Sequence, residues 1–186
     1  KQYEGASVFI SGREYARELT APPAMSLDGN VFIRRESLQR MIWEKLEEWG
    51  WQAPNRAIAR AAAFYPFPVD LQRSLEAMSS DETETLLQHE LGELDIGREL
   101  GSEWEEMLSA LPRSRTEFQL RAIRDHLVDC RRTLPWLIEE ERVAAIHFYF
   151  ANFTTMRQSL FPALKNAYAD WLENGSKQKL KETCRR

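Results

Sequence analysis

The chain has 186 residues, of which 43% are hydrophobic and 29% are charged, and this composition and length fit one globular domain. The formal net charge is -4, and Lys and Arg cluster only at the C-terminal end, which argues against a nucleic-acid partner. No run approaches the roughly 18 apolar residues that cross a bilayer, and the two cysteines give no disulfide framework, so we expect a cytoplasmic protein with no membrane partner.

The first 35 residues have the least regular pattern in the chain. Ser7–Ile10 fits a short strand, and Ala21-Pro22-Pro23 is a break. We therefore expect residues 1–35 to form an irregular N-terminal arm.

Apolar residues recur at helical spacing over residues 36–49, and Gly50 is a typical helix end. Pro54 suits the first turn of a second helix, which Pro66 stops, and a short helix is expected over residues 69–78. Ser79 stands three residues before Glu82, which predicts the start of a long helix that ends at Gly101 or Met107.

The C-terminal half predicts three further helices. Ser114 and Glu117 open one that runs to about Thr133, Pro135 starts the next, and the last covers residues 155–173. The sequence therefore predicts an all-α, single-domain helical bundle of five to seven helices over residues 36–175. Residues 176–186 are expected to form a basic, solvated C-terminal tail.

The three histidines fall in three different predicted helices. In helical projection His89, Glu90 and Glu93 lie within an apolar arc, and His147 shares a stripe with Glu140. His126 lies only at the edge of its apolar stripe, with Asp129 pointing further out. An ionised group inside an apolar interior needs a counter-charge, a metal or a proton, so these positions are candidates for a polar cavity.

Glu82 and His89 have the same seven-residue spacing as Glu140 and His147, and Glu93 lies one turn from His89. Helical proteins build metal centres from carboxylate and imidazole groups on facing helices. The leading hypothesis is a cavity that binds a small ligand or a metal (Fe, Mn or Zn). Its candidate ligands are His89, Glu93, Glu140, His147, Glu82 and Glu90.

The Glu-x6-His spacing resembles that on a helix of haem-oxygenase-like metal oxidases, which implies redox chemistry at a bound metal. The His-x3-Asp/Glu-x2-His run of those proteins is absent. The string HELGE at residues 89–93 resembles the HExxH motif of zinc peptidases, which implies a zinc hydrolase. Here Glu93 replaces the second histidine, so this is the third hypothesis.

Structural explanations of the same residues remain open. Glu82 fits a helix cap, Glu140 fits an ion pair within its charged run, and the histidines fit satisfied core positions. Under these explanations the protein is a non-catalytic interaction or regulatory module. A homo-oligomer formed through the aromatic face of Phe148 and Tyr149 is then the expected assembly.

Overall fold

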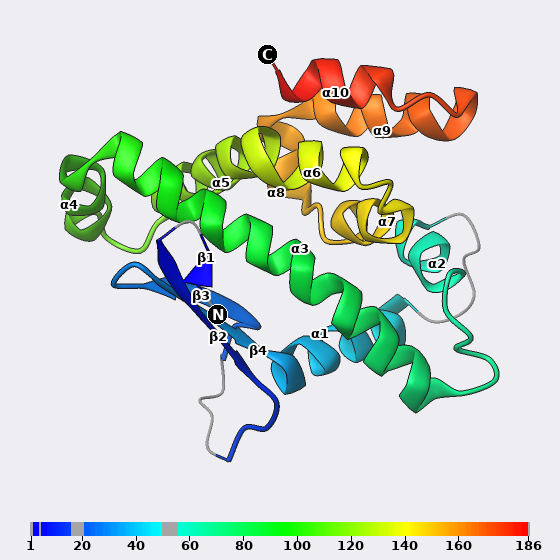
Figure 1. Cartoon of the computed structure of the whole chain (residues 1–186). Coiled ribbons are helices and arrows are strands. Elements are labelled where there is room, and N and C mark those ends of the chain that lie inside the picture. Colours follow the sequence, from blue (N-terminus) through cyan, green and yellow to red (C-terminus); the bar gives the residue numbers. More distant parts are fainter. Residues whose placement is uncertain (1, 4, 16–20, 50–55, 186) are drawn as a thin grey trace.

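The computed structural model describes residues 2–3, 5–15, 21–49 and 56–185. The protein is mostly helical, with a small sheet formed by its N-terminal residues (Figure 1). The mostly helical prediction is confirmed, whereas the all-α prediction is wrong. The expected helix ends at Gly50 and Pro54 lie outside the described residues. None of the described helices combines the length and the apolar character that a membrane crossing needs.

Four strands replace the expected irregular arm, and they lie in the order β1-β2-β4-β3. β2 and β4 are parallel, while β3 and β4 form an antiparallel hairpin. Asp28 and Gly29 form the hairpin turn with φ of 49° and 74°, the left-handed conformation that favours Asp-Gly in two-residue turns. The expected strand at residues 7–10 lies inside β2. The strands are β1 (Gln2–Tyr3), β2 (Ala6–Ser11), β3 (Ala24–Leu27) and β4 (Asn30–Arg34).

The helices follow the sheet directly. α1 is close to the expected 36–49 helix, while several longer predicted segments are divided, so the described residues form more helices than the five to seven expected. The helical elements are α1 (Arg35–Trp49), α2 (Ala57–Ala62), α3 (Leu71–Leu100), α4 (Ser102–Ala110), α5 (Arg115–Val128), the π-helix η1 (Asp129–Thr133), α6 (Leu134–Glu139), α7 (Val143–Ala151), α8 (Thr155–Leu160), α9 (Pro162–Asn174) and α10 (Gln178–Cys184).

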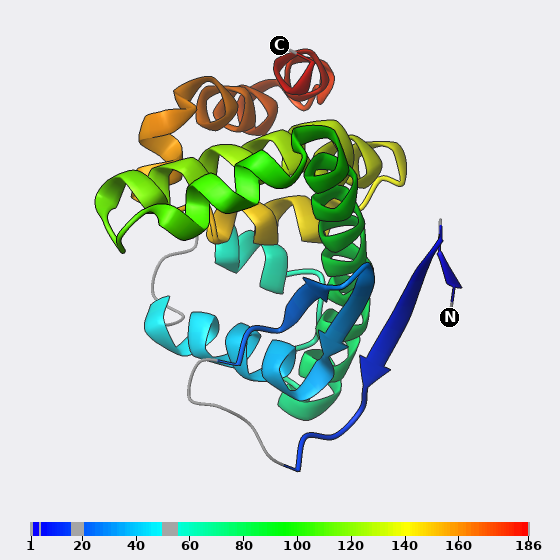
Figure 2. The same cartoon turned by 90° about the vertical axis from the view of Figure 1, so that its left-hand side faces the viewer.

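Helix α3 is the longest element. The sheet and α1 lie on one side of it, and α5, α6 and α7 lie on the other (Figures 1 and 2). Its Leu87 and Leu91 pack against the inner face of the sheet, which Val8 and Val31 help to form. Elsewhere along α3, Met78 packs with α1, α2 and α7. A third apolar cluster joins α6, α7, α9 and α10.

The predicted helix start at Ser79 is wrong, because α3 begins at Leu71, eight residues earlier in the chain. Asp70 is its cap, and the Asp70 carboxylate accepts a hydrogen bond from the Arg73 amide at 3.0 Å. Ser79 is buried in the middle of the helix, where its hydroxyl donates to the Glu76 carbonyl at 3.0 Å. Glu82 is therefore not a capping residue.

The helix predicted to start at Pro135 and run through His147 is also divided. α5, η1 and α6 follow one another directly, with Pro135 in the first turn of α6. The chain breaks instead at Glu141, which has a φ of 52° and separates α6 from α7. Glu140 thus lies at the end of one helix and His147 within another, which removes their predicted shared stripe.

The C-terminal segment is not the solvated tail that the sequence predicts. Residues 178–184 form α10, which packs on α9, α6 and η1 (Figure 2). Leu180 is fully buried and Cys184 is nearly so. The lysines of this segment lie on a helix whose apolar side completes the core.

Candidate metal centre

Helix α3 carries His89 and Glu93 one turn apart, with 3.6 Å between His89 Nε2 and Glu93 Oε1. Between them lies Gly92, at the closest approach of α3 to the end of α5. A Cβ atom on Gly92 would stand 2.8 Å from Val128 Cγ1, closer than real Cβ contacts allow. Glycine therefore lets the two helices meet at this point, which brings His89 and Glu93 against the residues of α5 and η1.

Asp129, the first residue of η1, holds the other nitrogen of His89. His89 Nδ1 and Asp129 Oδ1 are 2.8 Å apart, and the Asp129 side chain is 2% exposed. Its second oxygen accepts a hydrogen bond from the Tyr149 hydroxyl at 3.0 Å and pairs with Arg157. Burial opposes its ionisation, but His89 and Arg157 outweigh burial and lower the pKa of Asp129 to about 2.

Helix α5 contributes Arg124 and Asp125 to the same region. The Arg124 guanidinium pairs with Glu93 Oε1 and lies 3.4 Å from Asp125 Oδ1. On the opposite side Ser26 of β3 donates to Glu93 Oε2 at 3.3 Å. Glu93 thus has partners on both the sheet and α5, and the Arg124 guanidinium lies between the Glu93 and Asp125 carboxylates.

His89, Glu93 and Asp125 can converge on one ion. Each offers one ligand atom, and these atoms lie within 4.8 Å of one another. Because Asp129 fixes Nδ1 of His89, Nε2 is the nitrogen left facing Glu93. Metal-binding histidines commonly have this arrangement, in which a carboxylate orients the ring from behind.

The protonation states follow from burial and neighbouring charge. Burial alone would lower the pKa of His89, but the Asp129 and Glu93 carboxylates outweigh it and raise that pKa well above its usual value. Burial opposes ionisation of Glu93 too, yet His89 and Arg124 lower its pKa. Burial raises the pKa of Asp125. Without a metal, His89 is therefore a cation held between two carboxylates.

The other four predicted ligands are not in this group. Glu82 and Glu90 are buried on α3, each with one carboxylate oxygen that has no hydrogen-bond partner among the described residues. Burial raises the pKa of Glu82 to about 8 and that of Glu90 to about 7. Glu140 is exposed at the end of α6.

His147 belongs to an aromatic cluster on α7 and α9. Its Nδ1 is 2.9 Å from the Tyr168 hydroxyl, and its ring stacks on Trp171 with centroids 5.0 Å apart. Burial, with the Arg60 and Lys177 cations, lowers the pKa of His147 to about 4. This histidine is a neutral core residue, as the structural explanation of the sequence expected.

The face predicted for dimerisation is used within the chain. Phe148 is 3% exposed and packs in the core with α1 and α2. The Tyr149 hydroxyl donates to Asp129. Phe148 therefore has almost no exposed surface, whereas Tyr149 is partly exposed.

Sequence reasoning did not consider Asp125, and it placed Asp129 on the outer side of its helix. Asp129 begins a π-helix, in which the ladder of hydrogen bonds widens by one residue, so the projection of a regular α-helix does not hold there. The charge pattern of Arg124 and Asp125, next to a histidine, was a signal that could have directed attention to this helix.

Neither a curated protein nor a solved structure matches the chain significantly. A family model does match, over residues 39–186, from within α1 to the C-terminal end. The matched region contains His89, Glu93, Asp125 and Asp129, but not the sheet. Since the model covers most of the sequence, the chain belongs to the family of unknown function DUF6866, of which it carries the C-terminal domain.

Proposed function

We propose that this protein binds a divalent metal ion through His89, Glu93 and Asp125. The observation that carries the proposal is the convergence of one imidazole nitrogen and two carboxylates within 4.8 Å, on two helices held together at Gly92. Asp129 supports the site from behind His89. One nitrogen and two oxygen ligands suit Mn²⁺, Fe²⁺ or Zn²⁺ better than a soft metal such as Cu⁺.

The charge balance of the site supports a cation as its ligand. Glu93 and Asp125 supply two negative charges, and in this structure Arg124 and protonated His89 compensate them. A metal ion would replace the proton of His89 and compete with Arg124 for Glu93. Removing the Arg124 charge should therefore strengthen metal binding, whereas it would only weaken a purely structural ion-pair network.

One of the three ligands, Glu93, lines a pocket of about 620 Å³ between the β3–β4 hairpin, α3, α4 and α5. Glu93 and Arg124 line it, together with Trp104, whose indole nitrogen has no hydrogen-bond partner among the described residues. Three protein ligands leave coordination positions open to water or substrate on this side. A bound metal would supply Lewis acidity there.

The hydrolase hypothesis drawn from HELGE is not the one that we propose. In the zinc peptidases the glutamate next to the first histidine is the general base. The corresponding residue here is Glu90. It is buried on α3 and does not join the group of His89, Glu93 and Asp125.

The first experiment measures metal content and affinity on protein purified without an affinity tag or chelator. Metal is quantified by elemental analysis, and the metal-free protein is then titrated with Mn²⁺ by electron paramagnetic resonance and with Zn²⁺ by calorimetry. We expect one ion per chain, a loss of at least tenfold in affinity for His89→Gln and Asp125→Asn, and tighter binding for Arg124→Gln.

Matched controls separate the site from surface charge. Glu140→Gln removes an exposed carboxylate, and His147→Gln removes a buried histidine of the aromatic cluster, so neither should change metal affinity. Circular dichroism checks that each variant is folded. Absence of saturable binding in the wild type, or equal loss in the control variants, would refute the proposal.

A further inference from the structure

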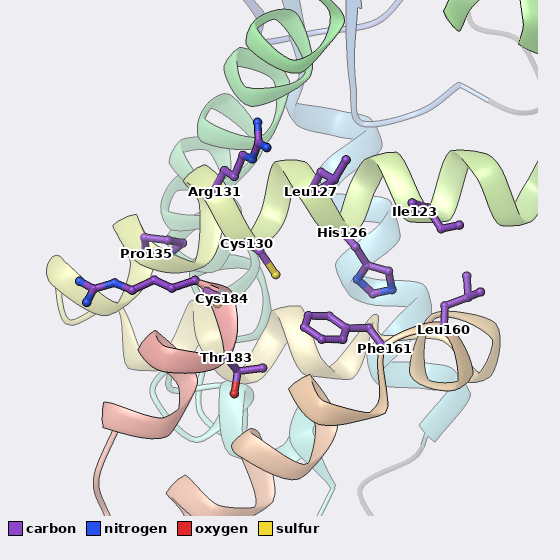
Figure 3. A pocket seen from close by; sticks show the side chains of 11 residues that line it. Ile123, His126, Leu127, Cys130, Arg131, Pro135, Leu160, Phe161, Thr183 and Cys184 are labelled. Atoms are coloured by element: carbon purple, nitrogen blue, oxygen red, sulfur yellow. The ribbon is translucent and has the colours of Figure 1, made fainter. Parts of the chain in front are cut away.

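The two cysteines of the chain, which are 54 positions apart, meet in one pocket on the far side of η1 from the candidate metal centre. Cys130 lies in η1 and Cys184 is the last residue of α10. Both line a pocket of about 670 Å³, and Cys130 packs against the apolar cluster that includes Cys184. Figure 3 shows Cys130 and His126 on one continuous helical segment. They project toward Phe161, which lies between α8 and α9, and toward the end of α10, where Cys184 lies.

The packing of α10 maintains this contact. Leu180, one turn before Cys184, is fully buried in the cluster formed by α6, α7 and α9. Cys130 packs against the same cluster from η1. The thiols are therefore brought together by the fold rather than by their positions in the sequence, and the pocket gives a small molecule access to them.

We propose that Cys130 and Cys184 form a reversible disulfide by exchange with a small disulfide of the glutathione type, which enters through this pocket. The lining suits such a reagent: Ile123, Leu160 and Phe161 are apolar, and Arg185 can attract its carboxylates. The cysteines are the reducing agent and the small disulfide is the oxidant.

The exchange takes place in two steps. The thiolate of one cysteine attacks the small disulfide, forms a mixed disulfide and releases one small thiol. The second cysteine then attacks the protein sulfur of the mixed disulfide, forms the Cys130–Cys184 bond and releases the second small thiol. Two electrons pass to the small disulfide, and the two thiol protons leave with the released thiols.

Two properties of the pair act in opposite directions on the first attack. The neighbouring Cys184 and burial raise the pKa of the Cys130 thiol, which disfavours its thiolate. Cys130 is partly exposed, however, whereas Cys184 is buried, so access to the small disulfide favours Cys130. The exchange leads to the same internal disulfide from either cysteine.

The test equilibrates the full chain in mixtures of reduced and oxidised glutathione, stops the exchange with acid and measures the intact mass. We expect the wild type to lose two hydrogen atoms and remain a monomer, whereas Cys130→Ser carries one glutathione on Cys184. Cys184→Ser is the matched variant, and it should carry one glutathione on Cys130. A wild type that keeps both thiols, carries only mixed disulfides or forms cross-linked dimers would overturn the proposal.

A second measurement isolates the contribution of the fold. The same equilibrium is then measured in urea. The ratio of internal to mixed disulfide should be lower in the unfolded chain, on the order of tenfold, because that chain must close a long loop to bring the cysteines together. An equal ratio in folded and unfolded protein would show that the fold does not bring the thiols together. The oxidised wild type should also melt at a higher temperature than the reduced form, with no such change in either serine variant.

Discussion

Glu82 gives the protein a pH-dependent stability that a single substitution should remove. Its side chain is buried on α3, and burial raises its pKa from 4.5 to about 8. At neutral pH the folded state therefore holds a neutral acid, whereas the unfolded chain has an ionised one. Folding then takes up a proton, so the stability contribution is fully present below pH 4.5 and is lost as the pH rises toward 8.

The size of the effect follows from the interval between the two pKa values. Each pH unit within that interval reduces the free energy of unfolding by about 1.4 kcal/mol, so the loss between pH 4.5 and pH 7 is about 3 kcal/mol. Glu82→Gln keeps the shape of the side chain and cannot ionise. Relative to the wild type, the variant should gain about 3 kcal/mol between pH 4.5 and pH 7, whatever constant offset the buried amide introduces.

The assay is urea denaturation at pH 4.5, 6, 7 and 8, followed by circular dichroism in the presence of a chelator. Ser79→Ala is the control, because it alters a buried polar residue of the same helix that does not titrate. Its difference from the wild type should not depend on pH. If the difference between Glu82→Gln and the wild type is also independent of pH, the carboxyl is ionised in the folded protein and the reasoning is refuted.

Three further predictions use the same denaturation assay. Asp129→Asn removes the buried carboxylate that pairs with the partly buried Arg157 and should cost about 3 to 5 kcal/mol; a loss below about 1 kcal/mol would contradict the described network. Gly92→Ala places a Cβ against Val128 and should cost about 1 to 3 kcal/mol, although alanine favours helices; a more stable variant would show that the helices can separate without cost. The stability of Glu90→Gln relative to the wild type should increase with pH only up to about pH 7, the pKa of Glu90 in the folded protein. A relative stability that kept increasing to pH 8 would contradict this pKa, because the group would then titrate at a higher pH.

Local signals predicted the ends of several elements correctly. Ser114 caps α5 by accepting a hydrogen bond from the Glu117 amide at 3.3 Å, as its spacing from Glu117 indicated. Gly175 ends α9 in the left-handed conformation, with a φ of 75°. These predictions succeed because a cap is decided by residues within one turn of it.

The missed elements depended on longer contacts or on signals that were overlooked. Asp28-Gly29 is a strong hairpin signal between Leu27 and Val31, and it could have identified β3 and β4. In contrast, β2 pairs with β4 across more than twenty residues, which local patterns do not reveal. Ser79 shows the opposite error, because a good capping sequence stands where packing continues the helix.

The candidate centre was half predictable for a similar reason. The helical phase of His89 and Glu93 correctly placed both on the inner side of α3. The partners on α5 and η1 could not be found in this way. Asp125 meets α3 only through the packing of the two helices near Gly92, and the projection of a regular α-helix does not hold in the π-helix that begins at Asp129. His147 has the right spacing from Glu140 in sequence, but the turn at Glu141 separates their helices.

Helix α3 packs against both the sheet and several other helices, and this has a consequence for local unfolding of the protein. Leu87 and Leu91 hold the sheet, and Met78 holds α1 and α2, so neither part can detach without exposing apolar surface of the same helix. The amide hydrogens in the middle of α3 should therefore exchange with solvent only through global unfolding, and should be the slowest in the protein. A ligand that joins α3 to α5 would stabilise the whole folded state. It would therefore slow the exchange of every amide that exchanges through global unfolding, and not only of those near its own site.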